Sequence, residues 1–343
     1  MFIAFRIIWG NPQKEKIMRK LKVILASIIA ICLFLASCEA GTGSAPSSES
    51  VDEQEDVLAH WKFQNVAGYF SGNVDDENLT FFDLSGHGND LITVSEGNGS
   101  QLDIFEWDED GAFGGAPALR FNNTLEKAQS VDPYDPSQTS YSGAYVSGKY
   151  FETVENATLN SNTGREGWTI EIIFKVSREW NNTYNRYVGI FSKQGVSKET
   201  DEPVFAMMLT SASDNTTSLG DDGAVGVQYV HINRDEYQYK NEYKNGEIYA
   251  EEWVHFMASS DGRITYLYLN GEQIDKIVSD NVLSSSSMGS WEVGVGRKYG
   301  EEGAKTMNTR YEEGLIRRLF CGTISEIRLS KGQLSISDSL IAG

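Results

Sequence analysis

Residues 264–278 read ITYLYLNGEQIDKIV, and this stretch decides the fold class. Two runs that suit β-strands, 264–269 and 273–278, flank the pair Asn270-Gly271. Asn and Gly both tolerate the positive φ angles that a two-residue hairpin turn requires. The stretch therefore predicts a β-hairpin, in which successive side chains point to opposite faces of a sheet.

The same pattern of strand-like runs and turns continues from residue 57 to the end of the chain. Short runs rich in β-branched and aromatic residues alternate with turns rich in Gly, Asn, Asp and Ser. No window of 11 or more residues there has a convincing helical period. Residues 57–343 are therefore expected to form one all-β jelly-roll sandwich of about 12 to 14 antiparallel strands. Strands are predicted at 58–63, 91–94, 118–121, 144–146, 168–176, 187–192, 205–210, 224–232, 253–258, 265–269, 291–296 and 322–329.

Residues 1–37 have the features of an export signal. Residues 23–36 are apolar apart from Ser27 and follow three basic residues, but the run is shorter than the ~20 residues of a spanning helix. It ends in Leu-Ala-Ser-Cys38, which resembles the lipobox of bacterial lipoproteins and implies a lipid on Cys38. The alternative is an ordinary signal peptide with a chance Cys. A start at Met18 instead of Met1 would remove residues 1–17 as an extension.

Residues 38–56 are small, polar and acidic, without an apolar period. Such a composition predicts a flexible tether between the lipid and the domain. The sequence therefore predicts an exported protein of the bacterial cell envelope, anchored to a membrane through its N-terminal lipid.

The chain is strongly acidic. It has 29 Lys and Arg against 49 Asp and Glu, a net charge of −20, and without residues 1–37 the net charge is −25. Such a field repels phosphate backbones and argues against nucleic acid as a partner. Cys321 is the one cysteine of the predicted domain, so we expect a buried, small apolar side chain and no internal disulfide.

Four stretches together resemble the laminin-G-like, or concanavalin-A-like, family of jelly-roll lectin domains. The resemblance covers roughly residues 58–341 and implies a β-sandwich that binds carbohydrate. Because one fold hosts many activities, this implication about function is an analogy. The four stretches are HWKF at 60–63 with DLSGHGND at 83–90, GWTIEIIFK at 167–175, EWVHF at 252–256 with YLYLNG at 266–271, and GTISEIRL at 322–329.

The resemblance also implies a structural calcium ion near the N-terminal strand. Ser325 stands where the family has an Asp, and a hydroxyl is a poor substitute for a carboxylate around calcium. The remaining candidate ligands are Asp83, Asn89, Asp90 and Glu326. A purely structural turn is the alternative, because Asp and Asn side chains cap turns.

A belt of aromatic residues between residues 180 and 243 is interleaved with amide and charged side chains. Aromatic rings stack on the faces of sugars, and polar neighbours bind the hydroxyl groups. Rings of the sandwich core are the alternative interpretation. The predicted ligand residues are Trp180, Tyr184, Tyr229, His231, Arg234, Tyr237 and Tyr239.

The leading hypothesis is non-catalytic binding of an extracellular polysaccharide or glycoconjugate. A protein-binding or adhesion module and a divergent glycoside hydrolase or polysaccharide lyase are the alternatives. The paired-carboxylate strand of glycoside hydrolases with this fold is missing. Glu171 is a single carboxylate in an apolar strand and is expected to be an edge or inter-strand partner, so no catalytic residue is predicted.

Overall fold

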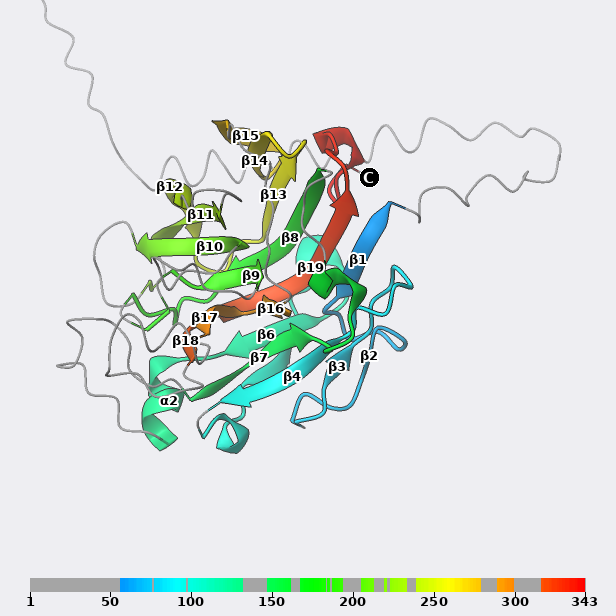
Figure 1. The fold of residues 1–343 in the computed structure, drawn as a ribbon. Coiled ribbons are helices and arrows are strands. Elements are labelled where there is room, and N and C mark those ends of the chain that lie inside the picture. Colours follow the sequence, from blue (N-terminus) through cyan, green and yellow to red (C-terminus); the bar gives the residue numbers. More distant parts are fainter. Residues whose placement is uncertain are drawn as a thin grey trace, which may run out of the picture. The chain divides into compact units, whose positions relative to one another are not determined.

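The computed structural model (Figure 1) describes most of the chain from residue 56 onward. Residues from Val51 to Gly343 form one compact unit, and the predicted export signal, Cys38 and nearly all of the tether lie outside the described residues. For some strand residues, including most of β12, only the backbone is described. The described ranges are 56–75, 77–96, 98–131, 147–161, 167–182, 184–185, 187–193, 205–212, 219–220, 223–232, 239–278, 289–298 and 316–342.

The domain is a sandwich of two antiparallel sheets, as predicted (Figure 1). The eight-stranded sheet has the order β15 (Glu272–Val278), β14 (Ile264–Leu269), β13 (Val254–Ser260), β8 (Trp168–Val176), β19 (Cys321–Lys331), β6 (Ala118–Asn122), β5 (Phe105–Asp108), with β1 (Val57–Lys62) also paired to β19. The nine-stranded sheet has the order β12 (Tyr239–Tyr249), β11 (Ala224–Ile232), β10 (Phe205–Ala212), β9 (Gly189–Lys193), β16 (Trp291–Val293), β7 (Gly148–Thr153), β4 (Leu91–Glu96), β3 (Thr80–Phe81), β2 (Phe70–Ser71). A separate pair joins β17 (Val295–Lys298) to β18 (Ile316–Leu319).

The predicted hairpin is confirmed by β14 and β15. Tyr266 pairs with Lys276 and Tyr268 with Gln273 across the two strands. Asn270 and Gly271 have φ angles of 50° and 81°, the left-handed pair that a tight hairpin turn requires.

The structure contains several elements that the sequence pattern did not predict. The strands β2, β3, β5, β7, β12 and β18 lie outside the predicted runs, partly because a strand of only two residues shows no alternation. The helix α2 (Leu125–Val131) is too short for its period to stand out. The predicted strand at 144–146 falls outside the described residues. No helix among the residues described combines the length and apolarity that a bilayer crossing needs.

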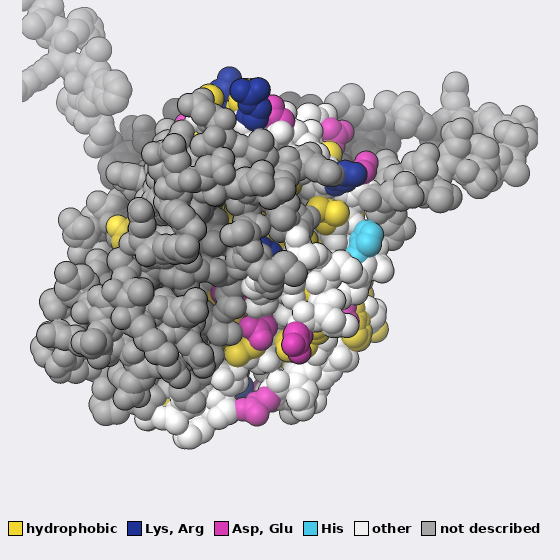
Figure 2. All heavy atoms as spheres, in the orientation of Figure 1, with side chains coloured by type: hydrophobic (Ala, Val, Ile, Leu, Met, Phe, Trp, Pro, Cys, Tyr) yellow, Lys and Arg dark blue, Asp and Glu magenta, His cyan; other side chains and the backbone are white. Residues whose placement is uncertain are grey.

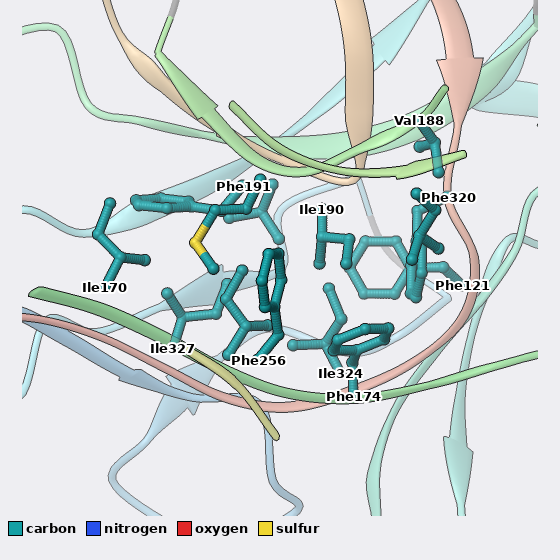
Figure 3. Close-up of a cluster of buried hydrophobic side chains, with 14 of the residues drawn as sticks. Phe121, Ile170, Phe174, Val188, Ile190, Phe191, Phe256, Phe320, Ile324 and Ile327 are labelled. Carbon is teal, nitrogen blue, oxygen red and sulfur yellow. The ribbon is translucent and has the colours of Figure 1, made fainter. Parts of the chain in front are cut away.

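The core lies between the two sheets. Along β8 the even-numbered residues, such as Ile170 and Phe174, face this core, and the odd-numbered ones face outward. Figure 3 shows Ile324 and Ile327 of β19 on the same side as Phe174, with Ile190 and Phe191 of β9 opposite.

Cys321 is fully buried in this core, which confirms the prediction of a small apolar side chain. Burial raises the pKa of its thiol to about 12, so the group stays protonated and unreactive at neutral pH.

Candidate functional site

The predicted ligand-binding role is wrong for three rings of the aromatic belt. Trp180, Tyr184 and Tyr229 are at most 4% exposed. Tyr229 packs against Trp168 and Phe205, with ring centroids 5.9 and 5.4 Å apart. Trp180 and Tyr229 belong to the core between the sheets, and Tyr184 belongs to a separate buried cluster with Tyr150, Val295 and Leu319. A sugar therefore has no exposed face of these rings on which to stack.

The other members of the belt are not tested by the structure. Arg234 and Tyr237 lie outside the described residues. His231 lies in β11 and Tyr239 in β12, and only their backbones are described. The strand that carries Tyr239 contacts β15, the edge strand of the other sheet. For these four residues the ligand role stays a prediction.

A pair of tyrosines on the outer face of the eight-stranded sheet has the exposure that the buried rings lack. Tyr266 and Tyr268 are two positions apart on β14 and point away from the core. Their ring centroids are 6.5 Å apart, and their planes are inclined at 35°. Both side chains are partly exposed. The two rings therefore present adjacent aromatic surface on one rigid strand.

Polar groups of the neighbouring strand surround this tyrosine pair. Gln273 is the exposed cross-strand partner of Tyr268, and the amine of Lys276 lies 5.3 Å from the ring centre of Tyr266. At the upper edge of Figure 2, where Figure 1 places β14 and β15, basic side chains lie beside hydrophobic ones. Partial burial, aided by the Tyr266 phenol, raises the pKa of Tyr268 above its ordinary 10.0, so this phenol stays neutral and can donate a hydrogen bond.

Sequence reasoning missed the tyrosine pair as a ligand site. The alternation in ITYLYL shows that the two tyrosines share a face opposite Leu267 and Leu269. It does not show which of the two faces is buried, because that depends on the packing of the other sheet. The leucines are at most 7% exposed, which leaves the tyrosines on the outside.

A buried charged cluster lies two strands away on the same outer face. Glu171 of β8 is fully buried and accepts hydrogen bonds from His255 Nε2 (3.1 Å), Arg328 Nε (2.8 Å) and the Leu340 N–H (2.7 Å). Burial on its own raises the pKa of the Glu171 carboxyl, but these donors and the charge of Arg328 outweigh burial and lower it from 4.5. Glu171 is thus an inter-strand partner, as expected.

The C-terminal residues cover this cluster and the strand beside it. Leu334 N–H donates to Thr169 Oγ1 (2.8 Å), and Ser259 Oγ donates to the Leu334 carbonyl (2.7 Å). Together with the bond from Leu340 to Glu171, these contacts hold the last residues against β8 and β13. Glu171 is therefore closed off from any substrate.

The turn predicted to bind calcium is held together by its own hydrogen bonds. Asp83 Oδ1 accepts from His60 N–H (3.0 Å) and from Ser85 N–H (3.0 Å) and Oγ (2.7 Å), and Oδ2 accepts from Asn89 N–H (3.0 Å) and Nδ2 (3.1 Å). A carboxylate has about four lone-pair sites, so protein donors already fill those of Asp83.

The other three candidate calcium ligands are also directed to different partners. Asp90 Oδ1 accepts from Asp83 N–H (2.8 Å), Asn89 Oδ1 from Leu159 N–H (2.8 Å), and Glu326 Oε1 lies 2.7 Å from His60 Nε2. Among the described residues, no group of three or more His, Cys, Asp or Glu side chains is placed to hold a metal. As arranged, these residues do not fit a calcium ion, because protein donors fill the oxygens of Asp83 and the other three side chains are directed to different partners.

A buried lysine makes the stability of the domain depend on pH. Lys193 is 1% exposed, donates to the Asn160 carbonyl (2.8 Å), and has its pKa lowered by burial from 10.5 to about 8. Between about pH 8 and 10.5 the unfolded chain binds more protons at this site than the folded one, so the free energy of unfolding rises with pH there. We expect a slope of up to about 1.4 kcal/mol per pH unit.

Urea unfolding of the parent protein and of Lys193→Met, compared at each pH between about 7.5 and 9.5, isolates this slope. The comparison is needed because burial also raises the pKa of Cys321 from 9.0 to about 12 and that of Tyr229 well above 10.0, and each of these groups lowers stability once its unfolded form ionises. The variant Lys193→Met should lose the slope attributable to this amine. An equal slope in both proteins would contradict the assignment.

No protein-family model and no curated protein sequence matches this chain. Among solved structures, domain 4 of AbnA, a GH43 arabinanase from Geobacillus stearothermophilus in complex with arabinotriose, is similar with a TM-score of 0.44 at 13% identity, covering 82% of this chain and 95% of that chain. The CBM40 of a Ruminococcus gnavus IT-sialidase has a TM-score of 0.40 at 16% identity, covering 57% and 93%.

The binding domain of Paraclostridial mosquitocidal protein 1 has a TM-score of 0.45 at 10% identity and covers 83% of this chain but 51% of that chain. This chain thus spans about half of the toxin chain. At these TM-scores the likenesses carry no argument about a ligand. The fold assignment rests on the two antiparallel sheets themselves.

Proposed function

We propose that this protein is a cell-envelope lipoprotein whose laminin-G-like sandwich binds an extracellular glycan without catalysis. The observation that carries the proposal is the tyrosine pair, Tyr266 and Tyr268, partly exposed side by side on β14. Tyrosine combines a flat apolar ring with a polar hydroxyl, which suits the apolar faces and hydroxyl rims of sugars. Gln273 and Lys276 supply hydrogen-bonding groups beside the rings.

Glu171, a carboxylate of the central strand β8, is unsuited to acid–base catalysis. Its oxygens accept from Arg328, His255 and the backbone of Leu340. An acid–base catalyst needs access to substrate and a pKa near the working pH. The buried, ion-paired Glu171, with its lowered pKa, has neither.

The lipid on Cys38 completes the proposal. A membrane anchor raises the effective concentration of each binding site at the cell surface, so a weak single site suffices to hold a long polymer. Metabolic labelling with a radioactive or alkyne fatty acid tests the anchor, because labelling should be lost in Cys38→Ser.

We expect the variants Tyr266→Ala and Tyr268→Ala each to weaken glycan affinity at least about tenfold, because exposed aromatic anchors dominate binding energies. The measurement is binding of the full chain, purified in detergent, to an array of soluble polysaccharides, with titration of each positive ligand. Tyr249→Ala is the matched control, since Tyr249 is 36% exposed on β12 of the other sheet. Unchanged affinity in both tyrosine variants, with folding intact, would contradict the site.

A further inference from the structure

The charges and ring geometry around the tyrosine pair narrow the class of glycan. Resting on the proposed function, we propose that the ligand is an uncharged polysaccharide bound as a single twisted chain, and not a uronate-containing or sulfated polymer. Three observations carry this: the pairing of the basic side chains on this face, the charge of the domain, and the tilt between the rings.

Anionic glycans are recognised by Arg and Lys side chains that are available to their carboxylates or sulfates. On the outer face and rim of the eight-stranded sheet, five basic side chains lie within ion-pair distance of a protein carboxylate. Their charges are therefore already balanced by neighbouring strands and turns. The pairs are Lys62 with Glu326 (3.9 Å), Arg120 with Glu251 (3.3 Å), Lys175 with Asp108 (3.0 Å), Arg178 with Glu251 (3.8 Å) and Arg328 with Glu171 (2.8 Å).

Beside the rings themselves, Lys276 lies over Tyr266, with its amine 5.3 Å from the ring centre. A cation–π contact of this kind is satisfied by the ring and does not need an anion. Asp275 and Glu272 of the same strand pair with Leu267 and Leu269, so the register places them on the opposite face from the rings. Lys276 is the basic side chain that the register places beside the rings, and its amine already contacts Tyr266.

The charge of the whole domain acts in the same direction. Residues 57–343 have 23 Lys and Arg against 42 Asp and Glu, a net charge of −19. A polyanion that approached the tyrosine pair would meet a repulsive field, whereas a neutral polymer would not. The field therefore selects against anionic polymers before any contact forms.

The tilt of 35° between the ring planes favours a single soluble chain over a flat crystalline surface. A flat crystalline surface needs aromatic rings that lie in one plane to contact all of them. Rings inclined to one another match successive sugars of one chain that rotates along its axis. Tyr266 and Tyr268 therefore suit a soluble chain better than a crystal face.

The test uses the full chain in detergent against three sets of probes. Xyloglucan, mixed-linkage β-glucan and galactomannan are neutral and soluble, alginate, polygalacturonate and heparin are anionic, and microcrystalline cellulose is flat and insoluble. Titrations run at about 0.05 and 0.5 M NaCl, because salt screens exposed charges. Tyr266→Ala, Tyr268→Ala and the control Tyr249→Ala are measured in parallel, each with a melting curve to confirm folding.

We expect a neutral soluble polymer to bind with an affinity that salt leaves unchanged and that the two tyrosine variants reduce at least about tenfold. Anionic polymers should bind at least about tenfold more weakly than that polymer. Tyrosine-dependent binding of an anionic polymer, weakened by salt and by Lys276→Gln, would overturn the neutral class and leave the proposed function standing. Tyrosine-dependent retention on cellulose without binding of soluble chains would overturn the single-chain form. Failure of every probe to bind through the tyrosines would overturn the proposed function itself.

Discussion

Replacement of Arg328 by Met is expected to lower the free energy of unfolding by about 3–5 kcal/mol, because it leaves a buried carboxylate without its charge partner. The Glu171 side chain is fully buried, and Arg328 donates to its Oε2 through both Nε and Nη2. Methionine keeps the apolar stem of the arginine but removes the charge and both donors. Urea unfolding at neutral pH gives the difference between the two proteins.

The matched control is Arg178→Met, because the Arg178 side chain is 56% exposed and lies 3.8 Å from Glu251. An exposed pair of this kind contributes about 0–1 kcal/mol. The double variant Glu171→Gln/Arg328→Met should regain part of the loss, since a buried amide is less costly than a buried unpaired charge. Equal effects of Arg328→Met and Arg178→Met would show that Arg328 is not the charge partner that the structure indicates.

Acid should reduce the effect of Arg328→Met. The pKa of Glu171 is lowered in the folded state from its ordinary 4.5, so its ionised form stabilises the fold above that pH. As the pH falls below 4.5 this contribution is lost progressively, because the unfolded chain takes up the proton first. The stability difference between the parent protein and the variant should therefore shrink there.

Replacement of Phe151 by Ala is expected to cost about 3–5 kcal/mol, because it opens a cavity among packed rings. Phe151 of β7 is fully buried, and four aromatic rings surround it. Their centroids lie 6.0 Å (Phe63), 5.4 Å (Phe81), 4.8 Å (Phe105) and 5.7 Å (Phe121) from that of Phe151. These rings come from both sheets, so the cavity weakens the contact between the two layers.

Phe113→Ala is the control for Phe151→Ala, since the same substitution at a ring that is 65% exposed removes almost no packing. We expect an effect within about 0.5 kcal/mol there. Thermal and urea unfolding of the three proteins are compared under one set of conditions. A cost below about 1 kcal/mol for Phe151→Ala would contradict the described packing of the rings.

The buried polar groups illustrate the limit of local sequence patterns. Glu171 is recognisable as an odd carboxylate in an apolar strand, and an inter-strand role could be inferred from that alone. Its partners are separated from it by 84 residues (His255) and 157 residues (Arg328). Such pairs depend on the order of the strands in the sheet, which short-range alternation does not encode.

The candidate site shows the same limit for aromatic residues. Tyr229 and Tyr268 both lie in alternating strands, yet the first is fully buried and the second partly exposed. The difference arises because Tyr229 faces Trp168 across the sandwich, whereas Tyr268 lies on the side of its sheet that faces away from the core. The sequence pattern favoured the belt that contains Tyr229 as the ligand surface, although Tyr229 is buried and the tyrosine pair on β14 is partly exposed.

The sequence by itself determined the all-β class, the hairpin at Asn270-Gly271 and the burial of Cys321. Each of these follows from local alternation, from turn residues that tolerate positive φ, or from the apolar character of one side chain. The tertiary structure alone decided which tyrosines are exposed, that Asp83 binds protein donors, and that Glu171 is neutralised from two other strands. The physical reason is that burial and charge pairing are set by the packing of segments distant in sequence, after the strands have formed.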